Sequence, residues 1–296
     1  MELQTNLAKL SLVQNYESNQ QENFPQTPIK KDTLPVERLP LSPDNPPWNG
    51  WTAFVVWVAS VVFIIIFPNL FLLPYLANQQ VNFSDQSAVL AFVKTDPTAI
   101  LLQISAIIPA HICIFILAWL VVTGFRKFSF RETLGWNLNG FKIWHSFAIF
   151  AGFYAIAILL ANLLGTSETD FDRMLKSSRT AVYFVAFFAT FTAPLVEEVI
   201  YRGLLYSAFQ RKFGGASAVL LVTVLFTIVH IPQYSSENIP NYASVITLLL
   251  LSLTLTLIRV RTKNLLPCIL LHTVINGIQS ILLILQPYIE NYIKIP

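Results

Sequence analysis

Six polar residues stand inside three otherwise apolar stretches of the chain. In order they are Glu197, Glu198, Arg202, His230, His272 and Asn276. A carboxylate and an imidazole can take a proton from water, and an imidazole or an amide can donate a hydrogen bond to a developing oxyanion. The residue types therefore indicate hydrolysis by an activated water.

Helical spacing sorts these residues into faces. Glu198 and Arg202 are four positions apart, so their side chains can pair, whereas Glu197 is rotated by about 100° and faces elsewhere. His272 and Asn276 also share one face. The ordinary alternatives are a supporting ion pair for Glu198 and Arg202, buried histidines without a catalytic role, and a packing amide for Asn276.

Depth along the helices gives a second test. Gly214 and Gly215 would form the turn between two helices, with Glu197 17 residues before Gly214 and His230 16 residues after it. In an antiparallel pair both side chains then lie about 25 Å from the turn at 1.5 Å per residue. His272 lies nearer the start of its own helix. It would lie at the same depth as Glu197 and His230 if the helix pair joined at Gly214 extends about three turns into the cytoplasm.

Other hydrolytic centres are less well supported. No Ser, Cys or Asp pair forms a nucleophile constellation, and the zinc-protease pattern HExxH is absent. An oxygen and nitrogen metal site remains open, with candidate ligands Glu197, Glu198, His230 and His272. We therefore expect either no required cofactor or a divalent metal such as zinc.

The elements that carry these residues must be membrane helices. Of the 296 residues, 54% are hydrophobic and only 12% are charged, whereas soluble domains contain about 25% charged residues. This composition excludes a soluble cytosolic enzyme, and the net charge of +3 without a basic stripe argues against a nucleic-acid partner. The lipid bilayer is the predicted partner.

Seven apolar runs are long enough to cross a bilayer as helices, because the runs lack strand-like alternation. They are 51–77, 98–123, 143–164, 180–203, 216–231, 242–258 and 265–285. The predicted fold is an all-α, polytopic transmembrane helix bundle of about seven spans, with room for an eighth. His111 and His145, in the second and third spans, are expected to be structural.

The distribution of basic residues predicts the orientation. Most Lys and Arg residues fall on one side if the N-terminus is cytoplasmic, as the positive-inside rule requires. The chain then divides into a polar, proline-rich, disordered tail (1–47), N-terminal helices (48–179), catalytic core helices (180–285) and a C-terminal tail (286–296). We expect an integral, multi-pass membrane protein, located in the plasma membrane if its source is bacterial.

The three motifs together resemble a known family. EExxxRG at 197–203, FxxxH at 226–230 and HxxxN at 272–276, in this order on separate apolar helices, are similar to the motifs of the CAAX-protease and bacteriocin-processing (CPBP, or Abi) family of intramembrane proteases. This family is related to the CAAX prenyl endopeptidase. The resemblance covers about residues 180–280. FRETLGW at 130–136 looks only vaguely like a cytoplasmic loop of the family.

The resemblance implies an intramembrane endopeptidase, of glutamic or metallo type, that acts on a membrane-tethered peptide or lipidated protein. By the same resemblance Glu197 and His230 would activate water, and His272 and Asn276 would stabilise the oxyanion. Glu198 and Arg202 would support the site. The alternatives are a catalytically silent membrane scaffold or chaperone of the same fold, and a transporter with a proton relay, for which inverted repeats are not evident.

Overall fold

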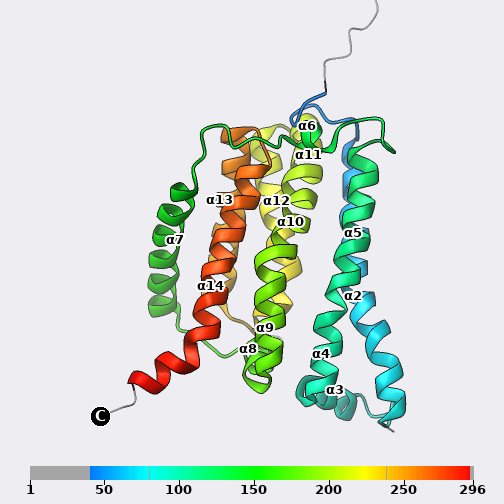
Figure 1. Cartoon of the computed structure of the whole chain (residues 1–296), viewed down its shortest axis with the longest axis vertical. Helices are drawn as coiled ribbons and strands as arrows, with labels where there is room; N and C mark the ends of the chain where they lie inside the picture. Colours follow the sequence, from blue (N-terminus) through cyan, green and yellow to red (C-terminus); the bar gives the residue numbers. More distant parts are fainter. Residues whose placement is uncertain (1–40, 80, 238, 294–296) are drawn as a thin grey trace, which may run out of the picture. The chain divides into compact units, whose positions relative to one another are not determined.

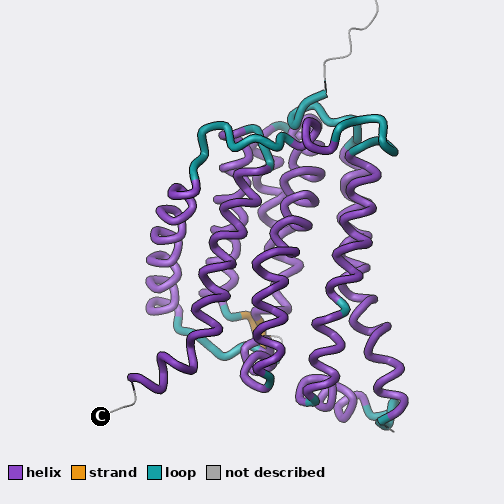
Figure 2. Tube along the Cα trace, viewed as in Figure 1, coloured by secondary structure: helices purple, strands orange, loops and turns teal. Residues whose placement is uncertain are grey.

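The computed structural model describes residues 41–79, 81–237 and 239–293, with side chains described as far as residue 289. Nearly all of this part of the chain is helical (Figure 2). The one short hairpin pairs β1 (Ser235–Ser236) with β2 (Ile239–Pro240) in antiparallel register. The predicted tail therefore lies mostly outside the described residues.

The helices follow one another with short connections. In chain order they are α2 (Gly50–Asn78), α3 (Gln86–Thr95), α4 (Pro97–Ser105), α5 (Ile107–Val122), α6 (Phe130–Leu134), α7 (Ile143–Leu164), α8 (Asp170–Ser177), α9 (Arg179–Phe187), η1 (Phe188–Thr192), α10 (Ala193–Glu198), η2 (Val199–Leu205), α11 (Tyr206–Phe213), α12 (Gly215–His230), η3 (Ile231–Tyr234), α13 (Tyr242–Thr262) and α14 (Leu266–Ile293). Here η1 and η2 are π-helical and η3 is a 3₁₀-helix.

Within the described residues, seven helical stretches are long and apolar enough to cross a membrane. They are Gly50–Asn78, Pro97–Val122, Ile143–Leu164, Arg179–Phe213, Gly215–Tyr234, Tyr242–Thr262 and Leu266–Ile289. Large apolar side chains on their outer faces are exposed, for example Leu163 and Phe191. Such a surface suits lipid rather than water. The predicted all-α, polytopic transmembrane fold is confirmed, and each predicted span coincides with one of these stretches.

The fourth span carries the two glutamates and is the longest, at 35 residues. It is helical from Glu197 through Gly203 to Phe213, and it ends where Gly214 adopts a positive φ of 82°. Glycine is favoured there because an L side chain is strained in that conformation. The span then turns back directly into α12 (Figure 1).

Helix α13 lies between α12, α7 and α14 and packs against all three. Its residues Ser252, Thr256 and Arg259 are buried and follow a helical spacing of four and three, so they share one face. This face meets the fourth span through hydrogen bonds from Arg202 and to Ser207. A polar seam thus joins the two helices inside the apolar bundle.

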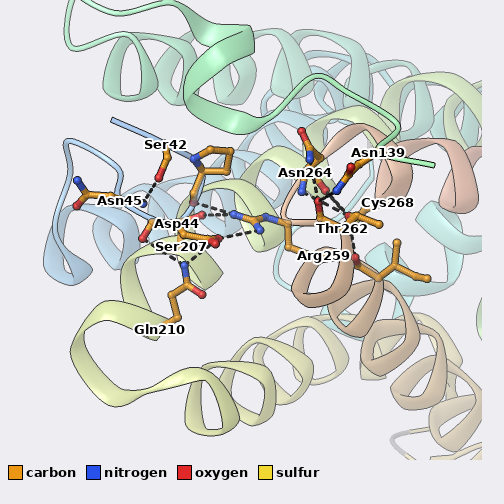
Figure 3. A network of polar contacts seen from close by, with 12 residues as sticks. Ser42, Asp44, Asn45, Asn139, Ser207, Gln210, Arg259, Thr262, Asn264 and Cys268 are labelled. Carbon is orange, nitrogen blue, oxygen red and sulfur yellow. Dashed lines mark hydrogen bonds and ion pairs between the residues drawn. The ribbon is translucent and has the colours of Figure 1, made fainter. Parts of the chain in front are cut away.

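Residues 41–48, which we call the N-terminal strap, pack against the bundle although most of them fall in the predicted disordered tail. The Trp48 indole donates to the Leu204 carbonyl at 3.0 Å, and Arg211 donates to the Trp48 carbonyl at 2.8 Å. Buried Arg259 binds Asp44 Oδ1 at 3.1 Å and the Pro43 carbonyl at 2.7 Å (Figure 3). The order of the strap follows from these polar contacts, above all from buried Arg259, which would otherwise be an uncompensated charge.

The C-terminal boundary also differs from the prediction. Helix α14 continues through Pro287 to Ile293, beyond the predicted end of the core at residue 285. Much of the segment predicted as a C-terminal tail is therefore helical.

Candidate active site

The centre of the candidate site is a fully buried ion pair. Arg202 Nη1 lies 2.9 Å from Glu198 Oε1, and neither side chain is exposed. The predicted pairing at a spacing of four residues is therefore present, although the chain between them is partly π-helical. Burial of two charged side chains is tolerated only because they neutralise each other and make further hydrogen bonds, in which Arg202 donates and Glu198 accepts.

The remaining donors of Arg202 are satisfied by α13. Its Nη2 donates to the carbonyl and the hydroxyl of Ser252, both at 2.8 Å, and its Nε donates to Thr256 Oγ1 at 3.3 Å. The guanidinium also stacks over the Phe226 ring, 4.8 Å from its centroid. The arginine therefore fixes the fourth span against α12 and α13 at the level of the glutamates.

His272 connects the ion pair to the second glutamate. Its Nδ1 lies 2.8 Å from Glu198 Oε1. Because an ionised carboxylate only accepts hydrogen bonds, Nδ1 must carry a proton. The imidazole is thereby oriented with Nε2 toward Glu197 Oε2, at 3.9 Å.

Glu197 is the accessible carboxylate of the site. Its side chain is 22% exposed, whereas that of Glu198 is 0% exposed. Glu197 Oε1 lies 3.9 Å from His230 Nε2, and Oε2 lies 3.9 Å from His272 Nε2. These separations are too long for direct hydrogen bonds. A water oxygen about 2.8 Å from both the carboxylate oxygen and the imidazole nitrogen would form an angle of roughly 90° with these two atoms. One water could therefore bridge each pair.

His230 is held in one orientation by its own helix. Its Nδ1 lies 2.7 Å from the Phe226 carbonyl, which can only accept, so this nitrogen carries a proton. The ring stacks on Phe226 with centroids 4.5 Å apart. In the neutral imidazole Nε2 is then a hydrogen-bond acceptor that faces Glu197. The expected equal depth of Glu197 and His230 is confirmed by their contact.

Asn276 is positioned by a backbone irregularity in the fourth span. Pro194 has no N–H, and in a π-helix this N–H would have met the Ala189 carbonyl. Asn276 Nδ2 donates to that carbonyl at 2.8 Å instead. One of its two N–H groups is thus used to hold α14 against η1. No contact joins Asn276 directly to Glu197 among the described residues.

His111 was expected to be structural, and the structure brings it to the edge of the site. It is buried on α5, and its Nδ1 lies 2.9 Å from Thr192 Oγ1, at the end of the π-helical segment that precedes the glutamates. The only sequence signal was an ionisable residue inside an apolar run. His145 is instead structural as expected, because its Nδ1 accepts from the Lys142 N–H at the start of α7.

The alternative of a metal ion held by Glu197, Glu198, His230 and His272 stays a prediction. No group of three or more His, Cys, Asp or Glu is arranged to hold a metal ion within the part of the chain that the structure describes. Glu198 Oε1 binds Arg202 and His272, whereas Glu198 Oε2 is buried and has no hydrogen-bond partner among the described residues. The 3.9 Å separations around Glu197 exceed the distance of about 3.3 Å between the ligands of a tetrahedral zinc ion.

Comparison with known proteins supports the predicted resemblance. The family model described as type II CAAX prenyl endopeptidase Rce1-like matches residues 179–278, a region that contains all three motifs. The match indicates a protease that works in the membrane on a peptide substrate, in agreement with the seven apolar helices. No curated protein and no solved structure matches the chain.

Proposed function

We propose that the protein is an intramembrane endopeptidase that hydrolyses a peptide bond of a membrane-tethered or lipidated substrate. The observation that carries this proposal is the position of Glu197, whose two carboxylate oxygens each face an imidazole Nε2 at 3.9 Å. Activation of water requires a general base within reach of the water, and a second acceptor beside the base helps to orient that water. The family match over residues 179–278 supports the same reaction.

In the proposed first step a water lies between Glu197 and His230. It donates one hydrogen bond to the carboxylate and one to the unprotonated Nε2 of His230. As the water oxygen attacks the peptide carbonyl carbon, Glu197 takes the proton that is released. Rigid anchoring of His230 to the Phe226 carbonyl keeps the acceptor in place without reorganisation.

The oxyanion of the tetrahedral intermediate would be stabilised by His272 and Asn276. His272 can donate through Nε2 only as an imidazolium, since its Nδ1 proton is bound by Glu198. This charge is compatible with the site because two carboxylates then balance one arginine and one imidazolium. The N–H of Asn276 that does not bind Ala189 is the second donor.

Collapse of the intermediate completes the hydrolysis. The carbon–nitrogen bond breaks, and the proton held by Glu197 passes to the leaving nitrogen. The products are an amine and a carboxylic acid, and the balance requires one water and no other reactant. Glu198 and Arg202 stay outside the reaction in this scheme, where they hold His272 in place.

We also propose that the end of the bundle that carries the strap and α6 is cytoplasmic, which places the N-terminus inside. Support comes from the basic residues at this end, which include Arg126, Lys127, Arg131, Arg211 and Lys263. In a bacterial source the membrane would be the plasma membrane.

His230→Ala is expected to lower the rate of peptide cleavage by about a hundredfold, because the water loses one of its two acceptors. The assay follows a prenylated or transmembrane peptide reporter with the purified full chain. His145→Ala is the matched control, since this histidine only caps α7, and it should cleave at the rate of the parent chain. Equal rates for the two variants would exclude His230 from the reaction.

Removal of divalent metals is expected to leave cleavage unchanged, because the proposed water is activated by a carboxylate and an imidazole. The measurement compares the chain before and after chelation and dialysis, with the bound metal determined by elemental analysis. A loss of activity that zinc restores at one equivalent would instead establish a metallo-endopeptidase.

A further inference from the structure

The two ends of the bundle differ in how many of their basic side chains are paired with acidic residues. At the end with α3 and α8, Lys94 and Arg173 both pair with Asp170, and Lys176 pairs with Glu168. The hydrogen bond from Lys94 holds the pKa of the Asp170 carboxyl below its usual value. Three cations at this end are thus neutralised by acidic residues of the protein, and Arg179 donates to the Ile284 carbonyl and stacks on two tyrosine rings.

The opposite end, which carries the strap and α6, keeps an excess of positive charge. Its described acidic residues are Asp44 and Glu132, and its basic residues are Arg126, Lys127, Arg131, Lys142, Arg211, Lys212, Arg259, Arg261 and Lys263. Arg131 and Lys263 are exposed, and their side chains make no ion pair or hydrogen bond with any described residue. Their charges are therefore available to an external anion.

These two cations line the same cavity, which is wide open at the protein surface and has a volume of about 590 Å³. This volume lies within the range of about 300–1,000 Å³ that is usual for ligand sites. The other lining residues are Pro43, Glu132, Gly135, Trp136, Asn137 and Asn264. The cavity thus combines two cations with an indole, two amides and one carboxylate.

The walls of the cavity are built in advance by backbone contacts between distant segments. The Leu265 N–H donates to the Gly135 carbonyl at 2.9 Å and to the Leu134 carbonyl at 3.1 Å. Asn139 Nδ2 donates to the Thr262 carbonyl at 2.9 Å (Figure 3). The loop around α6 is therefore fixed to the turn between α13 and α14, and the site does not need to be ordered by a ligand.

Gly135 is the point at which three segments meet. Its φ is +76°, and a Cβ atom there would lie 2.7 Å from Asn264 Oδ1 and 2.9 Å from Pro43 Cγ. Only glycine allows the α6 loop, the α13–α14 turn and the strap to approach this closely. The strap thereby contributes a wall to the cavity in addition to its contact with Arg259.

We propose that this cavity binds the headgroup of an anionic phospholipid. Arg131 and Lys263 would bind the phosphate, while Glu132 and the two amides would bind headgroup hydroxyls. Trp136 has the side chain most often found at the level of lipid headgroups. A lipid is favoured over a soluble ligand because the cavity lies where membrane helices α13 and α14 meet at the basic end of the bundle.

The test measures lipid binding by the purified full chain in detergent, by native mass spectrometry with added phosphatidylglycerol or phosphatidylcholine. We expect the parent chain to retain one phosphatidylglycerol at a saturable site. Arg131→Gln with Lys263→Gln should weaken this binding by at least about tenfold. Arg126→Gln with Lys127→Gln removes the same charge at the same end outside the cavity, and should leave the binding unchanged.

Three results would overturn the proposal. Equal weakening by the two double variants would show a diffuse basic surface rather than a site. Equal retention of phosphatidylcholine would show that the charge is not used, and competition by inorganic phosphate at similar concentration would assign the cavity to a free anion. The two single variants, Arg131→Gln and Lys263→Gln, repeat the test if the double variant folds poorly. No peptidase assay is involved, so the outcome is independent of the proposed function.

Discussion

Glu197→Gln is expected to lower the rate of peptide cleavage by about a thousandfold or more while the protein keeps its fold. Glutamine has the same shape as glutamate but cannot take the proton of the attacking water, and general-base catalysis contributes about 10²- to 10⁴-fold. Neither imidazole is within direct hydrogen-bond distance of Glu197, since both nitrogens lie 3.9 Å away. The substitution should therefore cost little stability.

The experiment compares single-turnover cleavage by the parent chain and by the variant, with thermal unfolding measured on the same samples. Glu168→Gln is the matched control, because this glutamate is exposed and pairs only with Lys176 at the far end of the bundle. Cleavage by Glu197→Gln within tenfold of the control would rule out Glu197 as the base.

Arg202→Met is expected to have the largest effect on stability, lowering the free energy of unfolding by about 3–5 kcal/mol. Among the described residues, the substitution leaves fully buried Glu198 with His272 as its one remaining hydrogen-bond partner. It also removes three hydrogen bonds to Ser252 and Thr256 on α13. An uncompensated carboxylate in an apolar interior is one of the costliest defects that a single substitution can create.

A double variant separates charge from packing. Glu198→Gln combined with Arg202→Met removes both charges and should recover about half of the lost stability, as measured by denaturant unfolding in detergent. If the single and double variants are equally unstable, the loss comes from the contacts with α13 rather than from the buried charge. An effect of Arg202→Met below about 1 kcal/mol would contradict the assigned ion pair.

Much of the site could be predicted because helical geometry is regular. A spacing of four residues was enough to pair Glu198 with Arg202, and counting from the turn at Gly214 was enough to bring Glu197 to His230. The seven spans followed from the length of the apolar runs. Each of these inferences needs only local periodicity, which a single sequence contains.

What could not be predicted depends on departures from that regularity. The π-helical segment before the glutamates frees the Ala189 carbonyl, which accepts a hydrogen bond from Asn276. No residue pattern specifies such a bulge, although Pro194 is its local cause. The catalytic assignment of Asn276 as an oxyanion donor thus stays a prediction.

Contacts between segments far apart in the chain also could not be predicted from the sequence. His111 reaches Thr192 across 81 positions, and Asp44 reaches Arg259 across 215. The strap looked disordered because its composition is polar and rich in proline. Its order comes from buried Arg259 on α13 and from exposed Arg211 on α11, which both donate to strap carbonyls. Their positions relative to the strap are visible only once the bundle has formed.

The most direct test of the proposed function is mass spectrometry of a peptide reporter incubated with the purified full chain in lipid. Prenylated and transmembrane reporters are assayed side by side with Glu197→Gln. The proposal predicts that the parent chain converts at least one reporter into two fragments whose masses sum to that of the reporter plus one water, and that the variant leaves it intact. Intact reporters of both classes, or equal fragments from the variant, would contradict it.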